Sequence, residues 1–355
     1  MSKHTLQELQ QWQALPLNIK VLMTKDRIRQ WINTYGEEGV YVSFSGGKDS
    51  TVLLHLVRED YPTIPAVYVD TGLEYPEIRE FVKTFDNVAW LKPRMNFKEV
   101  IKKYGYPVVS KEISQMVYEC QYAKEKGKPI PKYREEKLLG TYIDKQTGEL
   151  SHFNAKKWGF LLNAPFKISH KCCAIMKKDP ARRYEKESGR KRITGMTASE
   201  SRLRTQQWLR HGCNAYDVKD PISNPMSFWT EQDILLYIKL NNIPICSVYG
   251  EIVEDRDGTD EVEGQLTISD IEGWEDMKLF DAKRLPLKTT GCERTGCAFC
   301  LFGLQNDGCP NRLERLGVTH PNIYEWILKP TEKGGLGIKD VIEWINEHGD
   351  LNIRL

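Results

Sequence analysis

The stretch VYVSFSGGKDSTVLLHLVR, residues 40–58, combines a short apolar run, a glycine turn and an apolar helical pattern. Residues 40–44 form the apolar run, which is typical of a buried parallel strand. The turn at Gly46-Gly47 follows, and residues 50–58 continue as a helix. This order predicts a strand-to-helix unit whose turn lies beyond the carboxyl end of the strand, where α/β sheets bind their ligands.

The same alternation continues along the chain. Residues 64–69 and 88–91 are predicted strands, with a helix over 76–85 between them, and a further strand ends near Gly195. Alternating strands and helices predict an α/β fold with a doubly wound parallel sheet. Ser45 and Asp70 both fall just after predicted strands, so we expect both at the ligand-binding edge of the sheet.

The chain divides into three predicted parts. Residues 1–36 form an N-terminal helical segment with a break near Pro16. Residues 37–250 form the α/β domain that contains the glycine turn, with an insertion at about 119–158 that lacks clear periodicity. A helix is expected over 180–187, with Asp179 as its N-cap, and another over 230–240, capped by Thr230 with Asp233 at its third position. Residues 251–355 contain an acidic insertion, a cysteine-rich segment and a helical tail.

Charge is balanced overall but unevenly distributed. Lys and Arg number 51 against 49 Asp and Glu, so the net charge of +2 says little about partners. Residues 167–192 contain ten basic and three acidic residues, and we expect this stretch either to face phosphates or to form an exposed surface. Residues 251–276 contain eleven acidic residues and one Arg, which indicates a solvated insertion.

No run of 18 apolar residues exists in the sequence, so no membrane-spanning segment is expected. The N-terminus is polar and lacks the apolar core of a signal peptide. Nine cysteines without such a signal indicate reduced thiols with metal or redox roles. We therefore expect a cytoplasmic protein.

The glycine turn has the chemistry of a phosphate loop. Glycines let backbone N–H groups approach phosphate oxygens, the following helix N-terminus favours anions, and Lys48 adds a positive charge. The spacing differs from the GxxxxGK[ST] loop of P-loop kinases. It matches the SGGxDS loop of ATP pyrophosphatases, which cleave between the α- and β-phosphates.

The cysteines are concentrated in two places. Cys292, Cys297 and Cys300 lie close together, Cys309 follows, and the adjacent pair Cys172-Cys173 lies far upstream. Thiolates at such spacing hold tetrahedral Zn²⁺ or an iron–sulfur cluster. Six candidates exist for four ligand positions, and their spacing does not choose among them.

Six segments of the sequence occur in an order that resembles the phosphoadenosine phosphosulfate (PAPS) reductase family, within the adenine-nucleotide α-hydrolase superfamily. They are SFSGGKDSTVLLHLV, VYVDTGLEYPE, KCCAIMKKDPARR, GMTASESRLR, NPMSFWTEQDILLYI and TGCAFC. The resemblance runs from about residue 37 to residue 325. It implies an adenine-nucleotide α-hydrolase-like sheet with an iron–sulfur or cysteine-rich C-terminal module.

The resemblance also assigns roles to the residues of the loop and its surroundings. The residues implied to cradle the pyrophosphate end of ATP are Ser45, Gly46, Gly47, Lys48, Asp49 and Ser50. Lys48 is implied to neutralise the leaving pyrophosphate, and Asp49 and Asp70 to help hold Mg²⁺. Arg202 and Arg204 stand where the family has anion-facing arginines, whereas its more usual arginine is replaced here by Thr197.

For the cysteines the resemblance offers two ligand sets. Iron–sulfur sulfonucleotide reductases imply a [4Fe–4S] cluster on Cys172, Cys173, Cys297 and Cys300. Enzymes of DNA phosphorothioation imply Cys292 with Cys297 and Cys300, the fourth ligand being Cys309 or one of the adjacent pair. Zn²⁺ is the alternative occupant.

Two departures separate this chain from the true reductases of the family. It keeps Lys48, which their loop typically lacks, and it has no cysteine beyond Cys309, where they carry a nucleophile. We therefore predict an enzyme that converts ATP to AMP and pyrophosphate while adenylating an acceptor. The predicted purpose is iron–sulfur-dependent sulfur transfer to DNA or tRNA, with a sulfur donor such as a cysteine desulfurase. The alternatives are a reductase that forms sulfite and a non-catalytic ATP-binding regulator.

Overall fold

The computed structural model describes residues 2–255 and 285–355, which form two compact units. The first unit comprises residues 1–68, 75–91 and 183–295, and the second comprises residues 69–74, 92–182 and 296–355. Both units are built from stretches that are distant in sequence. The predicted division at residues 36 and 250 was consecutive, and it stays a prediction.

The first unit is built on a six-stranded sheet in the order β3-β2-β1-β4-β6-β5. The strands are β1 (Val40–Ser43), β2 (Ala66–Val69), β3 (Val88–Leu91), β4 (Lys191–Thr194), β5 (Asn214–Ala215) and β6 (Ile222–Ser223). β1 pairs in parallel with β2 and β4, and β4 with β6, while β5 runs antiparallel to β6. The predicted α/β class with a mostly parallel sheet is confirmed.

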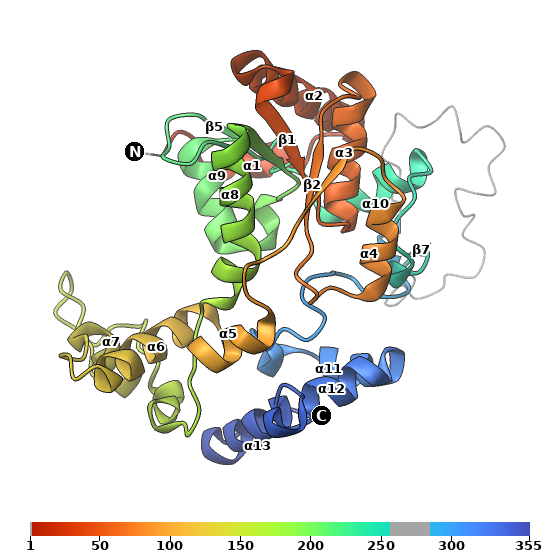
Figure 1. Ribbon diagram of the computed structural model, residues 1–355. Coiled ribbons are helices and arrows are strands. Elements are labelled where there is room, and N and C mark those ends of the chain that lie inside the picture. The colour runs from red at the N-terminus through yellow and green to blue at the C-terminus, as the bar shows by residue number, and fades with distance from the viewer. Residues whose placement is uncertain (1, 256–284) are drawn as a thin grey trace, which may run out of the picture. The chain divides into compact units, whose positions relative to one another are not determined.

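Helices cover both faces of this sheet. Helices α3 (Lys48–Asp60) and α4 (Pro76–Lys83) lie on one side, and the part of α8 (Asp179–Ser188) from Arg183 onward lies on the other (Figure 1). The strand order reverses between β1 and β4, since β2 and β3 extend one way and β6 the other. Such a reversal opens a crevice at the carboxyl ends of the two central strands, where ligands of α/β proteins bind.

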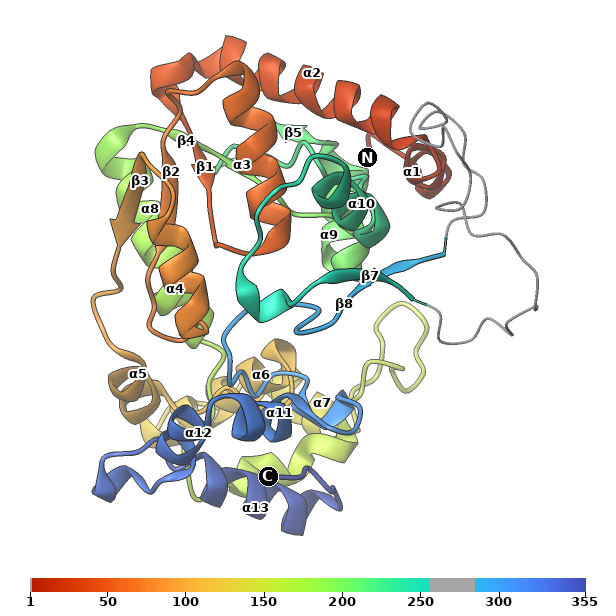
Figure 2. The same cartoon turned by 90° about the vertical axis from the view of Figure 1, so that its right-hand side faces the viewer.

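The N-terminal helices pack against the sheet domain. Helix α1 (Leu6–Gln13) and helix α2 (Leu17–Tyr35) meet at Pro16, as predicted. Helices α2 and α10 (Glu231–Leu240) both contact α3, as Figure 2 shows. A buried ion pair joins α2 to α10, because Lys20 Nζ lies 2.7 Å from Asp233 Oδ2. Thr230 caps α10, as predicted.

The second unit is helical in the part of the chain that the structure describes. Its α-helices are α5 (Phe97–Tyr104), α6 (Lys111–Glu125), α7 (Lys132–Leu139), α11 (Arg312–Thr319), α12 (Pro321–Leu328) and α13 (Ile338–Gly349). Residues 296–355 share this unit with residues 92–182. A separate cysteine-rich C-terminal module is therefore not confirmed.

The predicted insertion at 119–158, which stays a prediction, begins inside α6 and contains α7; α6 buries an apolar face that includes Met116, Val117 and Cys120. One local prediction was wrong. Asp179 is not an N-cap, since a π-helical stretch (Ala174–Lys178) runs directly into α8. Pro180 has no N–H to donate, so a local change in the helical hydrogen-bond pattern just before it accommodates the ring.

The predicted acidic insertion lies largely outside the described residues. The strands that flank it, β7 (Ile252–Glu254) and β8 (Leu287–Thr289), pair antiparallel. Strand β8 is fixed to α10, because the Gln232 side chain exchanges two hydrogen bonds with the Leu287 backbone at 2.6 and 2.9 Å. Among the described residues, no helix has the length and apolar character needed to cross a membrane.

Candidate functional site

The glycine loop lies between β1 and α3 and is fixed by its own hydroxyl groups. The Ser45 backbone N–H donates to Ser50 Oγ at 3.1 Å, and Ser50 Oγ donates to the Gly47 carbonyl at 2.8 Å. Gly46 has a φ of +72°, and a Cβ there would lie 2.8 Å from Val82. No side chain caps the first turn of α3. The N-terminus of α3 therefore has the partial positive charge that favours a bound anion.

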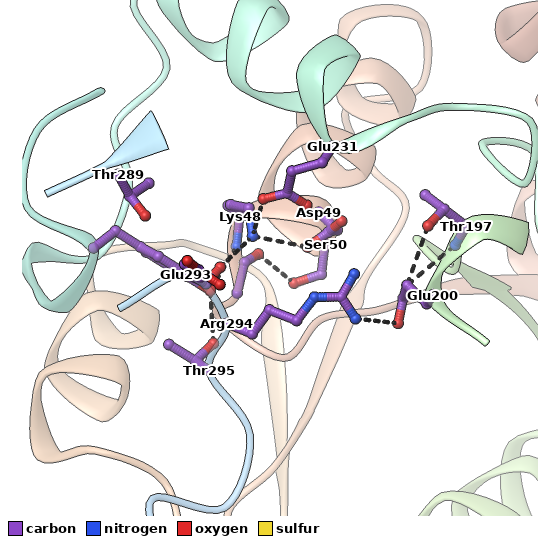
Figure 3. A network of polar contacts seen from close by, with 12 residues as sticks. Lys48, Asp49, Ser50, Thr197, Glu200, Glu231, Thr289, Glu293, Arg294 and Thr295 are labelled. Atoms are coloured by element: carbon purple, nitrogen blue, oxygen red, sulfur yellow. Dashed lines mark hydrogen bonds and ion pairs between the residues drawn. The ribbon is translucent and has the colours of Figure 1, made fainter. Parts of the chain in front are cut away.

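Lys48 is the first residue of α3, and its side chain is only 1% exposed. The ammonium group lies 2.8 Å from Glu231 Oε1 and donates to the Glu293 carbonyl at 2.6 Å (Figure 3). Its backbone N–H donates to the Tyr249 hydroxyl at 3.2 Å. A buried ammonium requires such partners, since an isolated charge in the interior is strongly unfavourable. Lys48 is thus a fixed charge at the loop.

Carboxylates surround this lysine. Burial raises the pKa of Asp49, and the neighbouring charges of Glu231 and Glu200 raise it further, against the opposing effect of Lys48. Glu200 lies in the 3₁₀ turn after β4, where its side chain accepts from the Thr197 N–H at 3.2 Å. The loop after β1 and the loop after β4 therefore bring Asp49 and Glu200 close enough for the charge of Glu200 to raise the pKa of Asp49.

Two arginines pair with Glu200. Arg204, one turn along at the start of α9 (Arg202–His211), forms a close ion pair with Glu200 Oε2. Arg294 lies 3.6 Å from the same oxygen and points to it from the opposite segment (Figure 3). Arg202, by contrast, is exposed on the surface of the first unit. The anion-facing role predicted for Arg202 and Arg204 stays a prediction.

Gly195 brings the loop after β4 against α3. A Cβ at this position would lie 2.9 Å from the Asp49 carbonyl oxygen and 3.3 Å from Ser50 Cα. Both neighbours are backbone atoms of the phosphate loop, so neither moves without distorting the turn. Only glycine permits the two loops to approach this closely.

We therefore expect Gly195→Ala to weaken nucleotide binding and to destabilise the fold by about 1–3 kcal/mol, the usual cost of overpacking. ATP affinity by calorimetry and thermal unfolding measure the two effects. Gly308→Ala is the control, because a Cβ there meets nothing within 4 Å. Equal ATP affinity in the Gly195 variant and the wild type would contradict the tight approach.

The second unit gathers four thiols around one small cavity. They are Cys172, Cys173, Cys297 and Cys300, and the cavity is also lined by Lys177. Sγ of Cys172 lies 3.9 Å from Sγ of Cys173. The structure thus unites the adjacent pair at the start of a helix with two cysteines more than 120 positions later.

Cationic groups compensate the thiols. A hydrogen bond from Cys172 lowers the pKa of Cys173 to about 6, helped by the charges of Lys111 and Lys177. Burial raises the pKa of Cys297 to about 12. Lys177 also lies 3.4 Å from Glu74. The cavity therefore combines four thiols with positive charge.

Comparison with known proteins identifies the family of this chain. Residues 39–136 and 132–301 match the family model of the phosphoadenosine phosphosulfate reductase domain. The chain belongs to the phosphoadenosine phosphosulfate reductase family. Both the glycine loop and the four cavity cysteines lie within the matched residues, so the predicted family membership is confirmed.

Relatives in the PAPS reductase family are distant. The chain is 24% identical over 268 residues to sulfate adenylyltransferase subunit 2 2 of Alkalilimnicola ehrlichii, covering 73% of this chain and 74% of that protein. It is 24% identical over 230 residues to adenosine 5'-phosphosulfate reductase 2 of Bacillus subtilis, covering 62% and 70%. A crystal structure of PAPS reductase from Candida auris has a TM-score of 0.36 at 15% identity and covers 72% of this chain and 98% of that chain.

Other similarities to the PAPS reductase family are local. The chain is 38% identical over 73 residues to uncharacterized protein MJ0973 of Methanocaldococcus jannaschii, which is 19% of this chain and 18% of that protein. It is 29% identical over 82 residues to PAPS reductase of Photobacterium profundum, which is 23% of this chain and 32% of that protein. The chain thus spans a third or less of these two relatives.

Within this PAPS reductase domain, the predicted residues of the glycine loop lie together. Two other predicted residues, Cys292 and Cys309, do not line the four-thiol cavity. Cys292 belongs to the first unit, where its N–H donates to the Val248 carbonyl at 2.9 Å. Cys309 is exposed and lies in a different cavity of about 240 Å³, with its Sγ 3.1 Å from Arg354 Nη1. Asp70 is buried directly after β2 and is grouped with the second unit.

Sequence reasoning missed several residues around Lys48. They are Glu231, Tyr249, Glu293, Arg294 and Thr295. The segment GCERTGC, residues 291–297, was interpreted only through its cysteines, and the start of α10 only through its capping box. For Arg294 the available signal was its position, because it is a charged residue inside the segment 291–297.

Proposed function

We propose that this member of the PAPS reductase family is an ATP pyrophosphatase that adenylates an acceptor and releases pyrophosphate. The observation that carries the proposal is the fixed, buried ammonium of Lys48 at the end of the glycine loop. An ammonium has three N–H donors. Glu231 and the Glu293 carbonyl take two of them, which leaves one for a phosphate oxygen.

The loop residues supply the rest of the phosphate site. The helix end of α3 favours the negative charge of phosphate oxygens, and its first-turn N–H groups other than that of Lys48 are proposed to bind them. Because Glu231 already balances Lys48, the lysine is held in place before the nucleotide arrives. Charge that develops on the departing pyrophosphate then meets a preorganised donor, which is the usual source of the largest catalytic contribution.

Asp49 is the proposed protein ligand of Mg²⁺, and the role of the other predicted ligand, Asp70, stays a prediction. The donor set fits, because Mg²⁺ in nucleotide sites takes one or two carboxylates and completes its shell with water and phosphate oxygens. When bound, Mg²⁺ supplies charge neutralisation of the phosphates. Asp49 is the only one of the two in the first unit, at the first turn of α3.

A [4Fe–4S] cluster on Cys172, Cys173, Cys297 and Cys300 is the second proposed component. Four thiols around one cavity, with cations beside them, fit such a group. Zn²⁺ stays the alternative occupant, since a tetrahedral site needs sulfurs about 3.8 Å apart and the Cys172 and Cys173 sulfurs lie 3.9 Å apart. When bound, the cluster supplies sulfur or electron chemistry.

The acceptor is proposed to be a nucleic acid, DNA or tRNA, with sulfur supplied by a partner such as a cysteine desulfurase. The basic stretch 167–192 gives limited support to a nucleic-acid acceptor, because several of its cations already form ion pairs with carboxylates of this chain. The pairs are Lys167–Glu125, Lys177–Glu74, Arg190–Glu38 and Arg192–Glu185. Adenylyl transfer itself is supported by the relative named as a sulfate adenylyltransferase subunit.

The test uses ATP labelled at the α-phosphate. Anaerobically purified protein is incubated with labelled ATP and Mg²⁺, in parallel with DNA, tRNA or sulfate. Labelled AMP or a labelled adenylate, formed together with pyrophosphate, is the expected result with one acceptor. Binding of ATP without turnover under every condition would instead favour the regulator.

A reductase is the second candidate, favoured by the relative named adenosine 5'-phosphosulfate reductase 2 and by the four-thiol cavity. Its test is the release of sulfite from adenosine or phosphoadenosine phosphosulfate with an external thiol. Sulfite formation in the absence of ATP turnover would replace the adenylation proposal.

A further inference from the structure

Arg294 is the second cation whose backbone is anchored at the phosphate loop. On one side of it, the Glu293 carbonyl accepts from the Lys48 ammonium at 2.6 Å. On the other side, Thr295 Oγ1 lies 2.6 Å from the Tyr249 hydroxyl, which in turn accepts from the Lys48 backbone N–H. Both neighbours of Arg294 are therefore tied to the first residue of α3.

The side chain of Arg294 faces solvent more than it faces the protein. It is 57% exposed, and its guanidinium lies 3.6 Å from Glu200 Oε2. An exposed pair at this distance is weak because water competes with it. Lys48, at 1% exposure, is the opposite case. The phosphate loop thus has two cations beside it, the buried ammonium of Lys48 and the solvent-exposed guanidinium of Arg294.

Glu200 does not depend on Arg294 for its charge balance. Arg204 pairs with it closely, and the Thr197 N–H donates to its other oxygen at 3.2 Å. Departure of Arg294 therefore leaves no unpaired buried carboxylate. A polyphosphate carries more negative charge than a carboxylate and accepts the planar guanidinium in the same paired geometry, so it competes well for Arg294.

We propose that Arg294 binds the terminal phosphates of the nucleotide and exchanges between them and Glu200. In this arrangement Glu200 is a competing anion that holds the arginine near the loop and lowers its affinity for phosphate. The inference rests on the proposed function, since it requires a pyrophosphate group at the loop. It adds a phosphate-binding residue that the glycine loop itself does not contain.

The experiment measures binding of inorganic pyrophosphate and of AMP by calorimetry at one ionic strength. Arg294→Gln is expected to weaken pyrophosphate binding about tenfold, the size of one lost charge-assisted contact, with AMP binding changed less than about twofold. Glu200→Gln is expected to strengthen pyrophosphate binding, because the competing carboxylate is gone. Arg294→Lys keeps the charge but loses the planar fork, so we expect an intermediate value.

Lys288→Gln is the matched control. It removes one positive charge from β8, where Lys288 pairs with Asp255 at 2.7 Å, and should leave pyrophosphate affinity unchanged. Thermal unfolding of each variant shows whether it is folded. Wild-type affinity for pyrophosphate in Arg294→Gln, or an equal loss of AMP, overturns the inference while the proposed function stands. A wild-type protein that binds neither pyrophosphate nor ATP overturns both.

Discussion

Lys48→Met is expected to lower the rate of AMP formation from ATP by about 10²–10³-fold, the usual effect of losing one preorganised donor to a developing negative charge. Methionine has a similar length and fills the buried space, so packing changes little. The ammonium contacts with Glu231 and the Glu293 carbonyl are lost. Single-turnover assays with α-labelled ATP measure the effect on the chemical step directly.

Glu231 is the side chain most affected by this change, and its 39% exposure lets water solvate the carboxylate that Lys48 leaves behind. The variant is therefore expected to fold, which thermal unfolding checks. Lys83→Met, at an exposed pair with Glu80 on α4, controls for the loss of one positive charge. A Lys48→Met protein with wild-type turnover would remove the lysine from the mechanism.

The second large effect concerns the four-thiol cavity. Cys297→Ser is expected to abolish the visible absorbance of anaerobically purified protein and to reduce its iron and sulfide, from about four of each per chain, to nearly none. A cluster that loses one thiolate ligand loses a strong, specific bond, and the remaining three thiols stay in a half-buried cavity.

Two further serine variants distinguish the ligand sets. Cys292→Ser and Cys309→Ser are expected to keep their iron, because neither residue lines the cavity of the other four. Loss of iron in Cys292→Ser would instead favour the alternative set that includes Cys292. A colourless wild-type protein that contains zinc would contradict the cluster altogether.

The elements around the phosphate loop were predictable because their signals are local. A buried strand, a glycine turn and an apolar helix occur within residues 40–58, and the structure has β1, the loop and α3 there. The carboxyl ends of parallel strands then bring Gly195 close to Asp49 by topology alone. The N-cap of α10 was likewise visible, since a capping box spans only four residues.

The partners of Lys48 were not predictable in the same way. Glu293 contributes a backbone carbonyl, which every residue has, and Glu231 and Tyr249 come from segments about 180–200 positions away. No spacing within a short stretch of sequence predicts contacts between residues so far apart in the chain. The same holds for the cysteines, whose number exceeded the available positions until the fold grouped Cys172 and Cys173 with Cys297 and Cys300.

The buried pair of Lys20 and Asp233 gives the N-terminal helices a part in the chemistry of the loop. Asp233 lies two residues after Glu231 on α10, and the matched family domain begins only at residue 39. A shortened protein that starts at that boundary would lose both the counter-ion of Asp233 and the helix α2 that carries it. The first 36 residues therefore help to hold α10, the helix whose Glu231 pairs with Lys48, and we expect a fragment without them to position that carboxylate less well.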